Sequence, residues 1–145
     1  MVNIKVKKLN KDANIPFRAT LGSAGADLCA CLDSDVIIEH GERRLIPTGI
    51  SVEIPAGYGG FIFARSSLGK SGISLANGVG VIDSDYRGEM KILLINHSGE
   101  PYIVRNGDRI AQLVILPVCI TEFIEEENLS ETSRGTGGFG STGIN

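Results

Sequence analysis

Short apolar runs, each closed by turn residues, divide this sequence from one end to the other. Frequent turns of this kind, without long helical periodicity, are typical of β-sandwiches and jelly rolls. Only residues 66–71 favour a helical turn. The sequence therefore predicts an all-β, jelly-roll-like sandwich or barrel with at most one short helix. The expected strands lie at residues 2–6, 35–39, 44–54 (interrupted at Pro47 and Gly49), 90–96 and 109–116.

Length and charge limit the possible classes. A chain of 145 residues, 42% hydrophobic, suggests one domain with a modest core. We expect this domain to cover residues 1–128 and a flexible glycine-rich lid to cover residues 129–145. The net charge of -3 argues against a nucleic-acid polymer as partner. The first eight residues resemble no secretory leader and no run has membrane-spanning length, so we expect a cytoplasmic protein without a membrane partner.

The three cysteines, Cys29, Cys31 and Cys119, cannot all pair with one another. No set of Cys and His residues has the spacing of a zinc site. We interpret all three as reduced thiols, as in a cytosolic protein. A metal site at the C-x-C pair of Cys29 and Cys31 is the alternative.

Residues 78–89 read as a strand, a tight polar turn and the start of a second strand. Asp83 is a turn former, because its short side chain can hydrogen-bond nearby backbone. The segment predicts a hairpin that presents the Asp83 carboxylate and the Tyr86 ring. Such a carboxylate could act as a general base, whereas the alternative is a solvated turn between two core strands.

Two further segments combine cations with hydroxyls or glycines. Residues 64–72 contain Arg65, Ser66 and Ser67, whose donors suit phosphate oxygens, particularly if a serine caps a helical turn. Residues 134–143 hold Arg134 and Phe139 among five glycines, as expected of a flexible lid that closes over a nucleotide. The alternatives are a capped surface turn and a disordered chain end.

Taken together, these segments resemble the homotrimeric dUTP diphosphatases. Five motifs of that family occur in the family's order and span nearly the full length of the chain. They are residues 24–28 (AGADL), 65–69 (RSSLG), 78–88 (GVGVIDSDYRG), 107–113 (GDRIAQL) and 134–143 (RGTGGFGSTG). The resemblance implies Mg²⁺-assisted hydrolysis of dUTP to dUMP and pyrophosphate, which limits uracil in DNA and supplies dUMP for thymidylate synthesis. It also implies a homotrimer in which the tail crosses to a neighbouring subunit.

The resemblance also implies roles for single residues. Asp83 would activate the water that attacks the α-phosphorus, and Tyr86 would pack against deoxyribose and exclude a 2′-hydroxyl. Asp27 would support the water or metal shell, while Mg²⁺ would be held mainly by the substrate phosphates and by no protein ligand directly. The uracil edge would be read by Asn77 and by the backbone of Gly80, Val81 and Ile82, with Phe139 stacking on the base. The phosphates would be bound by Arg65, Ser66, Ser67, Gly69, Gln112 and Arg134, with Gly140 and Ser141 of the tail beside them.

Two alternatives remain at this point. Ser67 stands where many dUTPases carry Gly, a feature shared with the related dCTP deaminases, and Glu89 is the nearby acid that could serve deamination. A deaminase, alone or combined with dUTPase activity, is therefore one alternative. A regulatory protein that binds dUTP and signals through its ordering tail is the other.

Overall fold

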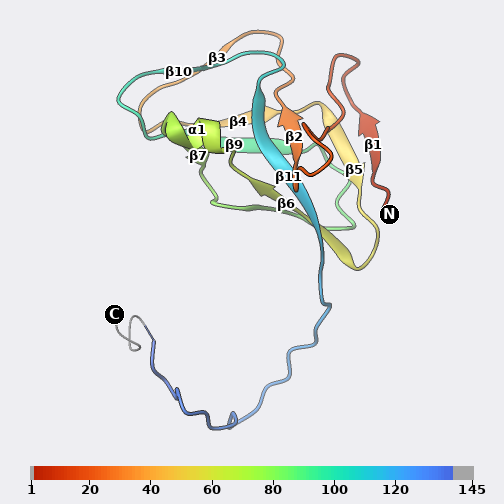
Figure 1. The fold of residues 1–145 in the computed structure, drawn as a ribbon, viewed down its shortest axis with the longest axis vertical. Coiled ribbons are helices and arrows are strands. Elements are labelled where there is room, and N and C mark those ends of the chain that lie inside the picture. The colour runs from red at the N-terminus through yellow and green to blue at the C-terminus, as the bar shows by residue number, and fades with distance from the viewer. Residues whose placement is uncertain (1, 139–145) are drawn as a thin grey trace.

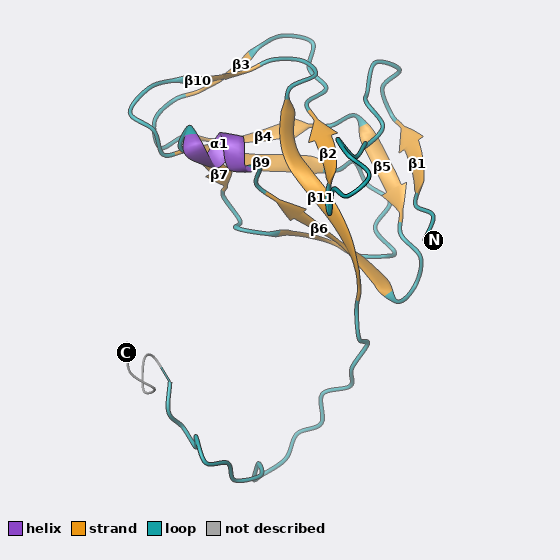
Figure 2. Cartoon of the chain, viewed as in Figure 1, coloured by secondary structure: helices purple, strands orange, loops and turns teal. Residues whose placement is uncertain are grey.

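The computed structural model describes residues 2–138 and contains short strands and one helix. All strand pairs are antiparallel. The elements are β1 (Lys5–Lys8), β2 (Ala26–Cys29), β3 (Val36–Ile38), β4 (Arg43–Pro47), β5 (Ile50–Glu53), β6 (Tyr58–Phe63), α1 (Ser66–Lys70), β7 (Ile73–Leu75), β8 (Gly80–Ile82), β9 (Lys91–Asn96), β10 (Tyr102–Val104) and β11 (Arg109–Pro117). The predicted all-β class with a single short helix is confirmed (Figure 2).

Two main sheets enclose the core. One has the strand order β2-β11-β6-β8 and the other the order β4-β9-β7, while the pairs β1-β5 and β3-β10 form two-stranded ladders. β11 runs through the centre of the molecule in Figure 1 and contacts β2 on one side and β6 on the other. β11 therefore lies between β2, which contains part of the first motif, and β6, which leads into the second motif.

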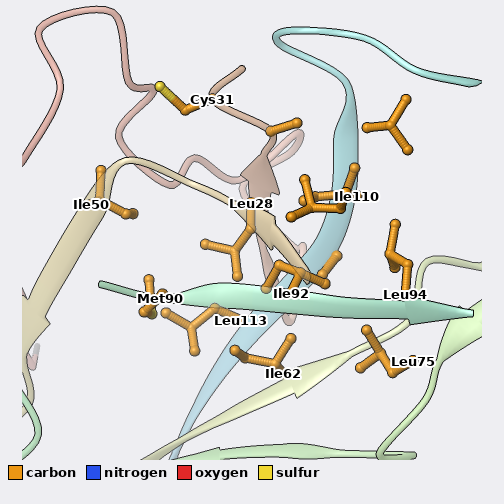
Figure 3. Packing of buried hydrophobic residues seen from close by; sticks show 14 of the residues in the cluster. Leu28, Cys31, Ile50, Ile62, Leu75, Met90, Ile92, Leu94, Ile110 and Leu113 are labelled. Carbon is orange, nitrogen blue, oxygen red and sulfur yellow. The ribbon is translucent and has the colours of Figure 1, made fainter. Parts of the chain in front are cut away.

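The core is built by alternating side chains from both sheets. Along β9, Ile92, Leu94 and Asn96 are buried while the residues between them are more exposed. Figure 3 shows Ile92 packed among Leu28 of β2 and Leu113 of β11. The buried Asn96 amide donates to the carbonyls of Ile38 and Glu100, and its carbonyl oxygen accepts from Ser98, so this polar side chain is fully bonded.

The segment after β8 differs from the predicted hairpin. Residues 84–85 form the expected turn, and the N–H of Tyr86 donates to the carbonyl of Asp83. The next strand, β9, however, pairs with β4 and β7 and not with β8. The segment is thus a corner between two sheets, because the apolar face of β9 is buried in the opposite layer. β8 remains the edge strand of its sheet.

Beyond β11 the described chain leaves the body. Residues 118–138 form no strand or helix and follow an arc away from the sheets (Figure 1). The apolar side chains of Ile120, Phe123 and Leu129 are 85%, 95% and 87% exposed. The division of the chain at residues 128 and 129 stays a prediction. Within residues 2–138, no helix has the length and apolar character needed to cross a membrane.

Candidate functional site

One pocket lies where β2, β11 and the start of α1 meet, and we call it the arginine pocket. Of the residues predicted to bind phosphate, it brings together Arg65, Ser66, Ser67 and Gln112, and it also contains Asp27. It is lined by Ala19, Ser23, Gly25, Asp27, Arg65, Ser66, Ser67, Arg109 and Gln112. Two cations, three serine hydroxyls and an amide line it, which suits an anion with several oxygens.

Arg65 is positioned by the end of β6. Its backbone is extended, and it occupies the N-cap position of α1 without a side-chain capping bond. The serine cap considered from the sequence is therefore absent from α1. Ser66 and Ser67 instead form the exposed first turn of α1. Their hydroxyls therefore remain beside the Arg65 guanidinium at the rim of the pocket.

Asp27 joins the two arginines of this pocket. Its Oδ1 lies 2.9 Å from Arg65 Nε and its Oδ2 lies 3.1 Å from Arg109 Nη1. The Asp27 side chain is only 11% exposed. A carboxylate so enclosed would repel an anion unless it were paired, and here both oxygens face a guanidinium.

Gln112 is a polar residue within the largely apolar strand β11. Its side-chain amide donates to the carbonyl of Ala64 at 3.0 Å, which fixes the amide beside Arg65. Gly25 lies against it, and a Cβ there would come within 2.7 Å of Gln112 Oε1. Glycine at this position therefore makes room for the Gln112 side chain.

A second pocket lies at the corner after β8, and we call it the corner pocket. It brings together the predicted residues Asn77, Gly80, Val81, Ile82, Asp83 and Tyr86. Its other lining residues are Leu45, Ile62, Glu89, Met90 and Lys91. Because β8 is an edge strand, the main-chain N–H and C=O groups on its outer side have no strand partner among the described residues. These groups can serve a ligand, which a paired hairpin strand would prevent.

Hydrogen bonds hold the corner in place around Asp83. Arg87 donates to the carbonyls of Ser84 and Tyr86, and the Tyr86 hydroxyl donates to the carbonyl of Glu89. The carboxylate of Glu89 accepts from the N–H of Gly49 and faces Lys91 at 3.5 Å. The Asp83 carboxylate is exposed and has no hydrogen bond or ion pair in the described part of the chain. Asp85, two residues further on, is exposed as well but does not line the pocket, so Asp83 is the exposed carboxylate that the pocket offers to a ligand or a water.

Asp83 in the corner pocket and Arg65 in the arginine pocket lie toward opposite ends of β6. Ile82 pairs with Gly60, so Asp83 follows beside Gly59, whereas Arg65 lies two residues beyond the end of β6. At about 3.3 Å per strand residue, Asp83 and Arg65 are separated by on the order of 20 Å along β6. The Asp83 and Arg65 of one chain therefore cannot contact the same phosphoryl group.

The remaining predicted residues join neither pocket in this single chain. Gly69 lies within α1, and a Cβ there would meet nothing within 4 Å. Arg134 lies in the tail, where its Nε donates to the carbonyl of Gly137. Phe139, Gly140 and Ser141 fall outside the described residues.

Arg109 and Lys91 line the two pockets but were not predicted from the sequence. Arg109 belongs to the fourth motif, yet simple strand alternation places it on the face opposite to Gln112. Lys91 opens an apolar strand, where a charged residue is commonly solvated. The only signal in the sequence that Lys91 belongs to the site was its position shortly after the polar turn.

The thiols and carboxylates do not form a metal cage. No group of three or more His, Cys, Asp or Glu residues is gathered at a metal-binding geometry within residues 2–138. All three cysteines are unpaired. Burial, and then the nearby Asp27 carboxylate, raise the pKa of the Cys29 thiol, which favours the neutral form over a metal-binding thiolate.

Comparisons with known proteins show the family of this chain. A family profile described as dUTPase matches residues 11–143. The chain belongs to the dUTPase family. The deoxyuridine 5'-triphosphate nucleotidohydrolase of Desulfitobacterium hafniense (strain DSM 10664 / DCB-2) is 54% identical over 99% of this chain and 97% of the relative.

Solved dUTPase structures share the fold. The Staphylococcus bacteriophage 80alpha dUTPase with dUPNHPP superposes with a TM-score of 0.85 at 29% identity, covering 98% of this chain and 99% of that one. A mutant dUTPase from phage phi11 of S. aureus, studied for the coordination of a structural Mg(II) ion, has a TM-score of 0.78 at 27% identity over 87% and 97%. The family resemblance inferred from the five motifs is thus confirmed.

Proposed function

We propose that this protein hydrolyses dUTP to dUMP and pyrophosphate. The observation that carries the proposal is the pair of pockets in a member of the dUTPase family. One pocket presents cations and hydroxyls to phosphates. The other presents open strand edge to a base and a free carboxylate, Asp83, to a water.

In the proposed reaction Asp83 accepts a proton from a water molecule as the water oxygen attacks the α-phosphorus of dUTP. The new bond joins the water oxygen to phosphorus, and the bond from that phosphorus to the bridging oxygen breaks. Pyrophosphate leaves with the bonding electrons, and dUMP remains. Arg65, Ser66, Ser67 and Gln112 stabilise the negative charge on the leaving phosphates.

The outer edge of β8 accounts for the choice of base. Uracil presents acceptor, donor and acceptor groups along one edge, which fixed main-chain N–H and C=O groups can complement. Cytosine lacks the N3 proton and carries an exocyclic amine, so it would leave main-chain groups unpaired. In this proposal the Tyr86 ring, which is held by its hydroxyl bond to the carbonyl of Glu89, excludes a 2′-hydroxyl.

Magnesium fits this site through the substrate and not through a protein cage. The nearest enclosed carboxylate, Asp27, already binds two arginines and is poorly placed to ligate a cation directly. Bound to the triphosphate, Mg²⁺ would neutralise phosphate charge and fix the chain for in-line attack. Asp27 could then support only the water shell of the ion.

We further propose that complete sites form between subunits of a homotrimer. Arg65 and Asp83 of one chain are too far apart to share a phosphoryl group, so each site needs these residues from different copies. The exposed apolar side chains of Ile120, Phe123 and Leu129 also suggest that the tail is covered in an assembly. Arg134 and the glycine-rich end would then close over a neighbour's site.

The function is tested by measuring pyrophosphate release with Mg²⁺ from dUTP, dCTP, dTTP and UTP, while ammonia is followed in the dCTP sample. We expect turnover confined to dUTP. Ammonia from dCTP would favour deamination. Tight dUTP binding without turnover of any of the four nucleotides would favour the regulatory alternative. Either result would contradict the proposal.

A further inference from the structure

A carboxylate in the middle of an anion-binding pocket needs an explanation. Asp27 carries a negative charge where phosphate oxygens are proposed to lie, and burial strengthens its repulsion of an anion. Its two arginine contacts suggest that it serves the arginines and not the ligand. The following inference rests on the proposed function only in taking the bound anion to be pyrophosphate-like.

A β-bulge explains how Arg109 reaches this pocket. The register between β11 and β2 shifts between Arg109 and Ala111, so Arg109 faces Cys29 while Ala111 already faces Leu28. Ile110 and Ala111 are both buried, and Arg109 falls on the same side of the strand as Gln112. Without the extra residue, Arg109 would point with Ala111 and Leu113 into the core.

Arg65 is held by two contacts, one with Asp27 of β2 and one with the main chain of β11. Its Nε pairs with Asp27 Oδ1 at 2.9 Å, and its Nη1 donates to the main-chain carbonyl of Arg109 at 3.1 Å. Asp27 is itself held by Arg109 Nη1 at 3.1 Å. Among the described residues the bonds of Arg65 use Nε and Nη1, which leaves Nη2 for a ligand.

The charges of this cluster indicate that Arg109 supports Arg65. Two guanidinium groups and one carboxylate give a formal charge of +1. If Arg109 were neutral, Asp27 and Arg65 would cancel and the carboxylate would be free to draw Arg65 away from the ligand. Arg109 is 45% exposed and Arg65 only 21% exposed, which fits an outer arginine that supports an inner one.

We propose that Arg109 is a positioning residue, which acts through Asp27 to fix the Arg65 guanidinium toward the leaving pyrophosphate. In this arrangement Asp27 is a connector between two cations. Its removal should weaken anion binding even though the net charge of the pocket becomes more positive. Weaker binding without Asp27 indicates positioning of Arg65, whereas simple charge attraction would make binding tighter.

The test measures binding of inorganic pyrophosphate by calorimetry in EDTA, with the full-length protein. We expect Arg109→Gln to weaken binding about tenfold, since a charge-assisted contact is lost while the main-chain carbonyl remains. Asp27→Asn should also weaken binding. Because both changes disrupt one arrangement, the double variant should be little worse than the poorer single variant.

The matched control is Arg105→Gln, which removes the same charge from the turn before β11. Arg105 is 63% exposed and pairs only loosely with Asp35, at 3.7 Å. This variant should bind pyrophosphate like the wild type. If Arg109→Gln does not fold, Arg109→Lys replaces it and should give an intermediate affinity, because lysine keeps the charge but lacks the planar fork.

Three results would overturn the inference: wild-type pyrophosphate affinity in Arg109→Gln, tighter binding in Asp27→Asn, or additive effects in the double variant, which would mean that Arg109 contacts the anion directly. Steady-state kinetics with dUTP separates this inference from the proposed function. A rise in KM larger than the fall in kcat is expected for Arg109→Gln. Wild-type protein that binds pyrophosphate through this cluster but leaves dUTP intact would contradict the function and leave the inference standing.

Discussion

The two ends of β6 present ligands with opposite kinds of surface. At one end the arginine pocket is made of charged and polar side chains held by ion pairs around Asp27. At the other end the corner pocket combines Gly80, apolar side chains and the open main chain of β8 with polar side chains such as Asn77 and Asp83. Flexible side chains at the first must be fixed by partners, whereas the main chain at the second is fixed by the sheet itself.

This difference shows how one small domain can separate attraction of phosphates from discrimination between bases. Charge attracts phosphates but distinguishes nucleotides poorly, because all of them carry the same phosphate chain. Main-chain hydrogen bonds contribute less attraction but reject a wrong base by leaving buried groups unpaired. We therefore expect variants of the arginine pocket to change affinity for phosphates, and variants of the corner pocket to change chemistry or the choice of base.

The largest effect should come from Asp83→Asn. The amide keeps the shape of the carboxylate but cannot take a proton, so kcat should fall by about 10²–10⁴-fold. Binding of a non-hydrolysable dUTP analogue should stay within a few-fold of wild type. Asp85→Asn, two residues further into the same turn, is the control and should retain most activity. A near-normal kcat in Asp83→Asn would show that Asp83 is not the general base.

A mixing experiment tests whether the two ends of β6 belong to different sites. Arg65→Gln and Asp83→Asn should each be nearly inactive alone. Co-refolded in equal amounts, they should recover about a quarter of wild-type activity, because random assembly places an intact Arg65 and an intact Asp83 from different subunits in that share of sites. Recovery is absent if both residues serve one site from a single chain.

Removal of residues 134–145 should have the next largest effect. Activity should fall at least tenfold, because the lid arginine is lost while both pockets stay intact. Unfolding temperature should change little, since the described residues of this segment, 134–138, are not buried and do not belong to the core cluster. Circular dichroism during heating provides the check, and loss of folding would show that the tail belongs to the core structure.

Two glycine substitutions should have the smallest effects and should separate the pockets. Gly25→Ala crowds Gln112 and should weaken pyrophosphate binding a few-fold, with dUMP binding nearly unchanged. Gly80→Ala places a Cβ 3.1 Å from Ile62 Cβ and should weaken dUMP binding, with pyrophosphate binding unchanged. Equal effects of either variant on both ligands would contradict the division between the pockets.

Much of the fold followed from residue patterns. The turn residues placed several strands close to their observed positions, because alternation and glycine act locally, but β7 and β10 were not predicted. Pro47 and Gly49 separated β4 from β5 as expected, and α1 occupies the expected helical turn. Which strands join which sheet could not be predicted, since the pairing of β9 with β4 and β7 depends on contacts distant in sequence.

The sequence named several residues that the structure gathers into pockets, but it did not predict their arrangement, and their roles stay predictions. The motifs contained Asp83, Arg65 and Gln112, and the structure distributes them between two pockets. Arg109 was missed because a register shift of one residue leaves no mark in strand alternation. The open edge of β8 was missed because the sequence predicted a hairpin, in which that edge would be paired.

The wall that the β8 main chain gives the corner pocket limits how this protein can change over evolutionary time. A Cβ at Gly80 in this wall would approach Ile62, and one at Gly60 on the neighbouring strand β6 would approach Ile54, Ile82 and Leu113. A specificity carried by side chains can be altered by exchanging one of them. A specificity carried by the path of the chain has no such single exchange, and most substitutions along this wall would obstruct the pocket before they gave it a new preference.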